Sequence, residues 1–367
     1  MSTTQDNTLK TKFGTIQISQ DEGAGDFDTI PIIDLTRMRS ADIEDRKALA
    51  LEIRDVCINV GFFYIKNHGV DSELIKEIHA TAKEYFALPL EKKKANARAN
   101  SSVFRGYTPV FEEFSQLDHS VGSLCESFDI GYELAGDPLA KPGDTLSMAQ
   151  SDMYGENVWP DSEVIPTFKS SYLRYFRAML TLSRDLLQIF ALALDLPESF
   201  FDSVTTRPGC MSRIIHYPPQ PIPDGNHPGI APHTDFECFT ILCQDDVRAL
   251  QVLNQSNRWV TAEPIPDHFV VNIGDFMRFW TNGLFRSTMH KATNLTGRDR
   301  YSVPFFFGVN FDAMISVLDH GATQKSDAGV KPQSIMAGDY IRRQLEAIYE
   351  KPLEVPQSTG AIMQIPV

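Results

Sequence analysis

The stretch APHTDFECFT, residues 231–240, places a histidine and an aspartate two positions apart in a mostly apolar segment. In a strand, or at the end of one, side chains two positions apart point to the same side, so His233 and Asp235 would project together. An imidazole beside a carboxylate is half of a metal site, but such a pair also occurs as a hydrogen-bonded pair in a loop. The surrounding sequence has to distinguish these two interpretations.

The chain around this pair has the pattern of many short strands. After residue 205, short apolar or alternating runs are separated by segments rich in Gly, Asn, Asp and Pro, which is typical of an antiparallel sandwich or barrel. The runs that predict strands are MSRIIHY, CFTILCQ, ALQVL, HFVVNI, DFMRFWT and RYSVPFFFGV, and the turn segments include PDGNHPG, NQSN, TNG and LTGRDR.

Helical patterns dominate the residues before this β-rich region. Ser40 is in position to cap a helix whose apolar residues recur every three or four positions up to residue 60. Residues 95–160 carry no clear pattern. The other predicted elements are short strands at 29–35 and 62–65, a helix that ends near Pro89, a solvated charge run at 91–94, a long helix at about 162–195 and a last helix at about 335–349.

These patterns predict a mainly β fold with helical support, of the α+β class. We expect four parts along the chain. They are a loose N-terminal arm at 1–28, a helical region at 29–200, a β-rich core at 201–330, and a C-terminal helix and tail at 331–367.

Composition narrows the classes of partner. The chain has 34 basic and 48 acidic residues, a net charge of −14, which argues against binding to nucleic acid or to an anionic membrane. No signal peptide and no run of about 20 apolar residues is visible. The five cysteines are scattered without a CxxC pair, which is typical of reduced thiols. We therefore expect a cytoplasmic protein, and we expect a monomer.

A third metal ligand is available in RSTMHKATN, where His290 stands in another alternating stretch. Two histidines and one carboxylate on one side of a metal leave the other side open, as in non-haem Fe(II) oxygenases, although the same donors also make catalytic zinc sites. The remaining histidines that we weighed lack such a pattern and are predicted at turns or on the surface; they are His68, His79, His119, His227, His268 and His320.

Arg300 and Ser302, in RYSVPFFF, are again two residues apart and share a face. An arginine that points into the protein needs an anion, because a buried unpaired guanidinium is very costly. Its planar fork fits a carboxylate, and a serine hydroxyl adds a donor. The anion is either a structural acid or, beside a metal, the carboxylate of an organic co-substrate.

Taken together, these motifs resemble the Fe(II)/2-oxoglutarate-dependent dioxygenases, and within them the isopenicillin N synthase-like branch. The resemblance rests on H-T-D at 233–235, on VVNIGDFMRFWTNGLFRSTMHKA, which contains His290, and on R-Y-S at 300–302. It spans about residues 29–310. The segments that agree in order before this region are IPIIDL, GFFYIKNHGV, FRGYTP, ESFDIG and HYPPQ.

The resemblance implies a double-stranded β-helix, a cupin-like jelly roll. It implies that His233, Asp235 and His290 bind Fe(II). It further implies that 2-oxoglutarate chelates this iron and that its far carboxylate meets Arg300 and Ser302, with Tyr217 helping to hold it. Such enzymes use O2 to convert 2-oxoglutarate to succinate and carbon dioxide while a substrate C–H bond is hydroxylated, desaturated or cyclised.

The substrate site is less visible in the sequence. Phe306 shares the face of Arg300, and Arg213 shares the face of Tyr217, so one could pack on the substrate and the other could pair with an acid on it. A core position for Phe306 and a surface position for Arg213 agree with the sequence at least as well as these contacts with a substrate. Arg105 and Tyr107 lie in a loop-like stretch that could close over the site.

Four other functions stay open at this point. Some members of the branch oxidise their substrate without 2-oxoglutarate, and another outcome is ethylene formation from 2-oxoglutarate itself. A zinc hydrolase would need a nearby base, for which Glu237 is available. A jelly-roll binding protein that does no chemistry is the non-enzymatic alternative.

Overall fold

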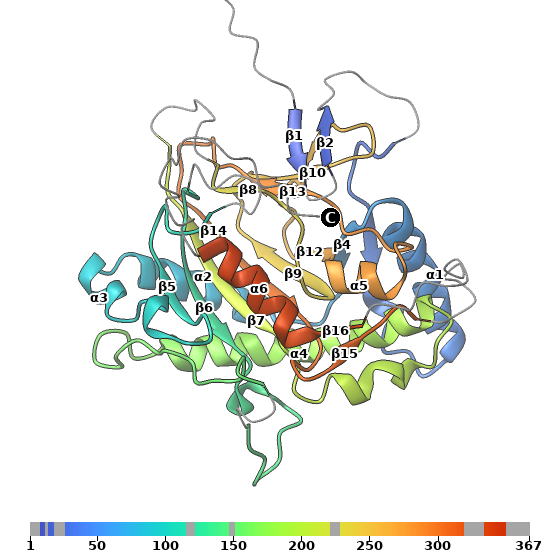
Figure 1. The fold of residues 1–367 in the computed structure, drawn as a ribbon, viewed down its shortest axis with the longest axis horizontal. Coiled ribbons are helices and arrows are strands. Elements are labelled where there is room, and N and C mark those ends of the chain that lie inside the picture. Colours follow the sequence, from blue (N-terminus) through green and yellow to red (C-terminus); the bar gives the residue numbers. More distant parts are fainter. Residues whose placement is uncertain are drawn as a thin grey trace, which may run out of the picture.

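Figure 1 shows the computed structural model of the chain, which describes residues 8–11, 14–17, 26–114, 122–146, 151–220, 228–318 and 334–349. Its centre is a pair of antiparallel sheets. The larger sheet has eight strands in the order β3-β4-β12-β9-β14-β7-β6-β5, and the smaller has four in the order β11-β10-β13-β8. Among the strands that the structure describes, only β3 and β4 run parallel to each other. Two sheets with helices packed around them confirm the α+β prediction and agree with a jelly-roll core.

The strands are short, as the turn-rich sequence predicted. Those of the large sheet are β3 Ile32–Asp34, β4 Phe62–Lys66, β12 Phe269–Ile273, β9 Phe239–Gln244, β14 Arg300–Phe307, β7 Met211–Tyr217, β6 Glu126–Gly131 and β5 Gly106–Thr108. Those of the small sheet are β11 Trp259–Thr261, β10 Leu250–Leu253, β13 His290–Ala292 and β8 Ile230–His233. Two further pairs are β1 Thr8–Thr11 with β2 Gly14–Gln17, and β15 Met314–Ile315 with β16 Ile335–Met336.

Helices cover one face of the large sheet. The longest, α4, packs against α1, α2 and β14, and Figure 1 shows it running along the edge of the molecule below the sheet. The α-helices are α1 Ile43–Asn59, α2 Ser72–Phe86, α3 Leu90–Lys94, α4 Phe168–Ala193, α5 Asp275–Trp280 and α6 Ala337–Tyr349. The 3-10 helices are η1 Leu35–Arg37, η2 Arg98–Asn100, η3 Leu134–Gly136 and η4 Glu198–Val204.

Strand β14 lies between the core and the cavity, and its side chains point alternately to one and to the other. Toward the helices, Phe305 meets Phe176 of α4 with ring centroids 5.1 Å apart, and the Tyr175 hydroxyl donates to the carbonyl of Val303. On the opposite face, the even-numbered residues line a cavity, as the two-residue spacing predicted. They are Arg300, Ser302, Pro304 and Phe306.

We predicted a strand for the run DFMRFWT, and this prediction is wrong, because the run forms the short helix α5. Its first N–H, that of Asp275, donates to the carbonyl of Asp235 at 2.9 Å, and the N–H of Phe276 reaches the carbonyl of Glu237 at 3.2 Å. Gly274 permits this approach, because a Cβ there would lie 2.1 Å from the Glu237 carbonyl oxygen. The start of α5 therefore anchors the turn that carries Asp235.

The charge run at 91–94 is also not wholly solvated, because Lys93 is buried in a polar cluster. Its ammonium lies 2.6 Å from Glu126 Oε2, which also accepts a hydrogen bond from the Tyr107 hydroxyl at 2.6 Å. Glu126 Oε1 lies 2.8 Å from His216 Nδ1, and His216 Nε2 lies 2.7 Å from Asp299. These contacts connect α3, β5, β6 and β7 beside the start of β14.

Two histidines predicted at turns or on the surface are more enclosed than expected. His79 lies in α2 with Nε2 3.2 Å from Cys243 Sγ. His68 is buried and stacks on Phe269 with ring centroids 4.2 Å apart. The cap of the first helix also differs from the prediction. The side chain of Asp42, and not that of Ser40, caps this helix by accepting a hydrogen bond from the N–H of Glu44. No helix among the described residues is long and apolar enough to cross a bilayer.

Because His216 contacts two carboxylates, Glu126 and Asp299, we expect the free energy of unfolding to depend on pH. Burial lowers the pKa of His216, but the hydrogen bonds that His216 donates to Glu126 and Asp299 outweigh this effect and raise the pKa above its usual value of 6.5. The stabilisation by protonated His216 is thus complete below about pH 6.5 and is lost as pH rises through the folded-state pKa. In denaturant unfolding from pH 6 to 9, the wild-type advantage over His216→Gln should shrink. A constant difference would contradict this assignment.

Candidate metal and co-substrate site

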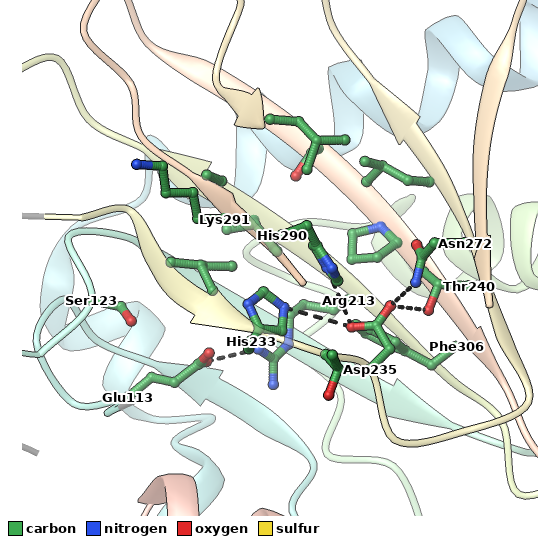
Figure 2. A pocket seen from close by; sticks show the side chains of 18 of the residues that line it. Glu113, Ser123, Arg213, His233, Asp235, Thr240, Asn272, His290, Lys291 and Phe306 are labelled. Carbon is green, nitrogen blue, oxygen red and sulfur yellow. Dashed lines mark hydrogen bonds and ion pairs between the residues drawn. The ribbon is translucent and has the colours of Figure 1, made fainter. Parts of the chain in front are cut away.

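Neighbouring strands bring the two predicted histidine ligands together. His233 ends β8 and is the register partner of His290, which begins β13. Their rings lie 4.2 Å apart between centroids. Asp235 follows in the turn after β8, and Figure 2 shows all three side chains pointing toward one another. Sequence positions 233, 235 and 290 thus converge as predicted.

The distances suit three ligands of one ion. Asp235 Oδ1 lies 3.6 Å from His233 Nε2 and 3.6 Å from His290 Nε2. One donor atom from each residue lies within 4.8 Å of the other two. A metal at this point would therefore receive two imidazole nitrogens and one carboxylate oxygen.

The hydrogen bonds around the three residues leave those donor atoms free. His233 Nδ1 donates to the carbonyl of Ala231 at 2.8 Å, and His290 Nδ1 donates to that of Thr288 at 3.1 Å. Because a carbonyl can only accept, each Nδ1 carries the proton and each Nε2 presents a lone pair. Phe62 packs edge-on against the His290 ring with centroids 5.0 Å apart.

The carboxylate of Asp235 is held in a similar way. Its Oδ2 accepts from Asn272 Nδ2 at 2.6 Å and from the Thr240 hydroxyl, while Oδ1 faces the histidines. Asn272 and Thr240 are register partners on β12 and β9. Figure 2 shows both on the side of Asp235 away from the imidazoles. The large sheet therefore orients the carboxylate of Asp235, and the small sheet supplies the two histidines that complete the set of metal ligands.

The electrostatics of Asp235 and His290 favour metal binding, whereas burial lowers the pKa of His233 but its interaction with Asp235 raises this pKa overall. Burial opposes the charged form of Asp235, but His290, His233 and the hydrogen bond from Asn272 lower its pKa overall. Burial, followed by the nearby His233, lowers the pKa of His290 to about 4, so this imidazole is neutral near neutral pH. An ionised carboxylate beside a neutral imidazole is the state that a divalent ion requires.

Arg300 is a buried cation without an acid. Its side chain is among the most buried of the described residues, and none of its contacts there is with a carboxylate. Its Nη1 lies 3.4 Å from Ser302 Oγ, its Nη2 lies 3.5 Å from Gln244, and its Nε has no partner. The ring of Tyr217 lies 4.6 Å below the guanidinium. A guanidinium in this state fits an incoming carboxylate.

The three ligands, Arg300, Ser302 and Tyr217 all line one cavity of about 1100 Å³, including its open mouth. Its walls come from the facing surfaces of the two sheets and from α6, which Figure 1 shows in front of the large sheet. Two histidines, one carboxylate and an open side toward a cavity are the donor set of non-haem Fe(II) oxygenases. The residues present therefore fit iron with a chelating, carboxylate-bearing co-substrate.

The predicted substrate residues have different outcomes. Phe306 lies on the cavity wall, as does Arg213. Arg213 does not await a substrate acid, however, because Nε lies 2.6 Å from Asp129, Nη1 lies 2.7 Å from Glu113, and Nη2 contacts the Tyr349 hydroxyl. This arginine is already neutralised, which corrects its predicted role.

Arg105 and Tyr107 do not line this cavity. Tyr107 is buried in β5 and donates to Glu126, and the guanidinium of Arg105 is buried against Gly131. Their predicted place in a loop over the site is therefore wrong. Part of this stretch forms strand β5, which pairs antiparallel with β6.

Sequence reasoning missed Asn272, Thr240, Gln244 and Glu113 at this site, and it considered Glu237 only as a hydrolytic base. Asn272 gave a signal, since it is a polar residue in the middle of the apolar run HFVVNI. Burial, followed by the charge of Asp235, raises the pKa of Glu237 to about 8. Such a shift in a cavity often marks a functional carboxyl group.

The hydrogen bonds to Asp235 lead to a prediction. Asn272→Leu and Thr240→Val each remove a donor to Oδ2 while keeping similar volume. We expect iron affinity to fall by about 10–100-fold in each variant, because supporting residues of metal ligands typically contribute this much. Equilibrium Fe(II) titration under anaerobic conditions measures the change, and an unaltered affinity in both variants would refute the supporting role.

Comparisons with known proteins agree with this chemistry. A family model described as 2OG-Fe(II) oxygenase superfamily matches residues 208–309, and one described as non-haem dioxygenase in morphine synthesis N-terminal matches residues 30–162. The chain is 35% identical over 334 residues to the 2-oxoglutarate-Fe(II) type oxidoreductase ppzC of Metarhizium majus, with 88% of each chain covered.

Two further proteins extend the comparison. Homoarginine-6-hydroxylase 2-ODD-233 of Oryza sativa subsp. japonica is 31% identical, with 86% of this chain and 96% of the relative covered. A Neurospora crassa protein, solved in complex with alpha-KG and thymine, has a TM-score of 0.73 and 25% identity, with 87% of this chain and 96% of that chain covered. The chain therefore belongs to the 2OG-Fe(II) oxygenase superfamily and is an oxidoreductase that uses Fe(II), 2-oxoglutarate and O2.

Proposed function

We propose that this enzyme couples the oxidative decarboxylation of 2-oxoglutarate to oxidation of a C–H bond in a small molecule of specialised metabolism. We propose further that it works in the cytoplasm as a monomer, without a nucleic-acid or membrane partner. The observation that carries the catalytic part is that the open side of the His-Asp-His cluster and the unpaired Arg300 face the same cavity.

In this proposal His233, Asp235 and His290 hold the iron. The bound Fe(II) would supply open coordination positions for 2-oxoglutarate and O2. Arg300 and Ser302 bind the far carboxylate of 2-oxoglutarate through a charge-assisted hydrogen bond and thereby set its orientation. No protein side chain is required as a general base.

The cavity walls contribute by orienting the substrate and excluding water. Phe306 and Pro304 lie on the same face of β14 as Arg300, and Leu345 and Ile348 extend the apolar wall from α6. The ammonium of Lys291 points away from the cluster in Figure 2 and lies 4.3 Å over the Trp259 ring. The names of two relatives, a homoarginine hydroxylase and the Neurospora crassa protein solved with thymine, support a small polar metabolite as substrate.

The test is to follow O2 uptake and succinate together while a metabolite library is supplied to the Fe(II) enzyme. We expect one library member to increase both in equal amounts. Product without succinate would instead indicate an oxidase that does not use 2-oxoglutarate, and ethylene in the headspace would indicate an ethylene-forming enzyme.

The remaining alternatives have their own outcomes. Zinc-supported turnover under nitrogen would favour a hydrolase. The absence of any O2 uptake with iron and 2-oxoglutarate across the library would favour a binding protein.

A further inference from the structure

Glu237 is a buried carboxyl group in the substrate part of the cavity. It is 4% exposed and lines the cavity together with Met211, Arg213 and Phe306. Among the described residues no side chain of another residue donates a hydrogen bond to it, and the only donor at its carboxyl group is its own backbone N–H. Because Glu237 lines the cavity and receives no hydrogen bond from another side chain, its carboxyl group is available to a ligand in the cavity.

The position of Glu237 is fixed by its surroundings. Its carbonyl accepts from the N–H of Phe276 at 3.2 Å, and the N–H of Cys238 donates to the carbonyl of Phe307 at 3.0 Å. Its side chain lies along Gly308, where an added Cβ would come within 3.2 Å of Glu237 Cγ. The backbone on both sides and the absence of a side chain at 308 therefore hold this carboxyl group at the cavity.

The neighbouring arginine does not serve as its partner. The Arg213 guanidinium is engaged by Asp129, Glu113 and the Tyr349 hydroxyl, as described above. One guanidinium thus faces two carboxylates before Glu237 is counted. Arg105, the other cation that interacts with Glu237 electrostatically, forms no ion pair with it.

The carboxyl groups around Arg213 are therefore unequally supplied with hydrogen-bond donors. Arg213 donates to Asp129 and Glu113, whereas among the described residues no other side chain donates to Glu237. A ligand that brings a hydrogen-bond donor, and above all a positively charged donor, would complete the site.

We propose that Glu237 determines substrate specificity by accepting a hydrogen bond from an N–H group of the substrate. The substrate class is then a small molecule with an amine, guanidine, amide or ring N–H, whose carbon skeleton packs on Phe306, Met211 and Leu345. This inference rests on the proposed function, because it assumes that the substrate occupies the same cavity. Glu237 lies beside the reacting centre and takes no part in holding the iron.

The test uses two matched pairs of ring compounds as binding probes. Piperidinium and N,N-dimethylpiperidinium are both cations, but only the first has an N–H. Piperidin-2-one and N-methylpiperidin-2-one are the corresponding neutral pair. Calorimetric titration into enzyme loaded anaerobically with Fe(II) and 2-oxoglutarate measures each affinity without turnover.

In wild-type enzyme we expect the N–H member of at least one pair to bind about tenfold or more tightly than its N-methyl analogue. Glu237→Leu should abolish this preference. Glu237→Gln keeps an acceptor oxygen without the charge, so it should retain a preference for the lactam and lose one for piperidinium. The pair that shows the preference in wild-type enzyme identifies whether the recognised nitrogen is neutral or charged.

Equal binding within both pairs, failure of every N–H probe to bind, or a preference that persists in Glu237→Leu would overturn the proposal. The proposed function is checked separately in the same samples, because Fe(II) and 2-oxoglutarate alone should give their visible charge-transfer band in all three proteins. A missing band in wild-type enzyme contradicts the proposed function, whereas a normal band with no N–H preference contradicts only the role of Glu237.

Discussion

His233→Ala is expected to abolish iron binding at stoichiometric concentrations and to lower turnover by more than about 100-fold. The loss should exceed the 10–100-fold typical of residues that only support a ligand, because one of three donors disappears. The fold should persist, since His233 ends a strand at a half-buried position and, among the described residues, its side chain donates one hydrogen bond, to the carbonyl of Ala231. Metal content after anaerobic loading, succinate formation and unfolding temperature together measure these effects.

His268→Ala is the matched control. His268 is also half-buried, and its Nδ1 donates to the carbonyl two residues earlier, that of Pro266, at 2.7 Å. It therefore shares the local hydrogen bond of His233 without the neighbouring Asp235 and His290. We expect normal iron content and turnover in this variant, and full activity in purified His233→Ala would refute the assignment of the ligands.

Arg300→Met is expected to weaken 2-oxoglutarate binding by at least about 30-fold while iron binding stays unchanged. Removing one partner of a buried charge pair costs about 2–5 kcal/mol, and about 1.4 kcal/mol corresponds to a factor of ten. The free enzyme should not lose stability, because Arg300 has no acid partner among the described residues and methionine keeps much of its volume. Affinity measured by titration and the unfolding temperature are both needed.

The two readouts separate the alternatives that the sequence left open for Arg300. If it had a structural role, the variant would be destabilised and its dependence on 2-oxoglutarate would be unchanged. Arg298→Met provides the control, since Arg298 is exposed two residues earlier and its one ion pair within the described ranges is with the exposed Asp246 at 3.1 Å. Neither stability nor co-substrate affinity should change appreciably there.

The metal and co-substrate residues could be predicted because they follow local rules. In β14, two-residue periodicity alone placed Arg300, Ser302, Pro304 and Phe306 on one face, and the structure puts all four on the cavity wall. His233 and Asp235 followed from the same rule at the end of β8. Local periodicity was enough here because each strand has one face toward the core and the other toward the cavity.

The residues that support the site could not be predicted from local patterns. Asn272 and Thr240 reach Asp235 only because β12 and β9 pair in one register, which depends on the whole sheet. Lys93 looked solvated within its charged run, yet it pairs with Glu126 from a strand 33 residues away. Arg213 was predicted to meet a substrate acid because its partners Asp129 and Glu113 lie 84 and 100 residues earlier.

The helix α5 was mistaken for a strand for a related reason. Its buried residues Phe276, Met277 and Trp280 read equally well as an apolar strand in so short a run. What decides the conformation is the contact of its first N–H groups with the carbonyls of residues 235–237, and that contact exists only in the folded chain.

The most direct test of the account is anaerobic titration of the enzyme with Fe(II) and 2-oxoglutarate, followed in the visible spectrum. We predict that the charge-transfer band of the Fe(II)–2-oxoglutarate chelate appears at stoichiometric iron in wild-type enzyme. It should require much more 2-oxoglutarate in Arg300→Met and should be absent in His233→Ala. A band of full intensity in His233→Ala would show that iron is bound elsewhere and would contradict the account.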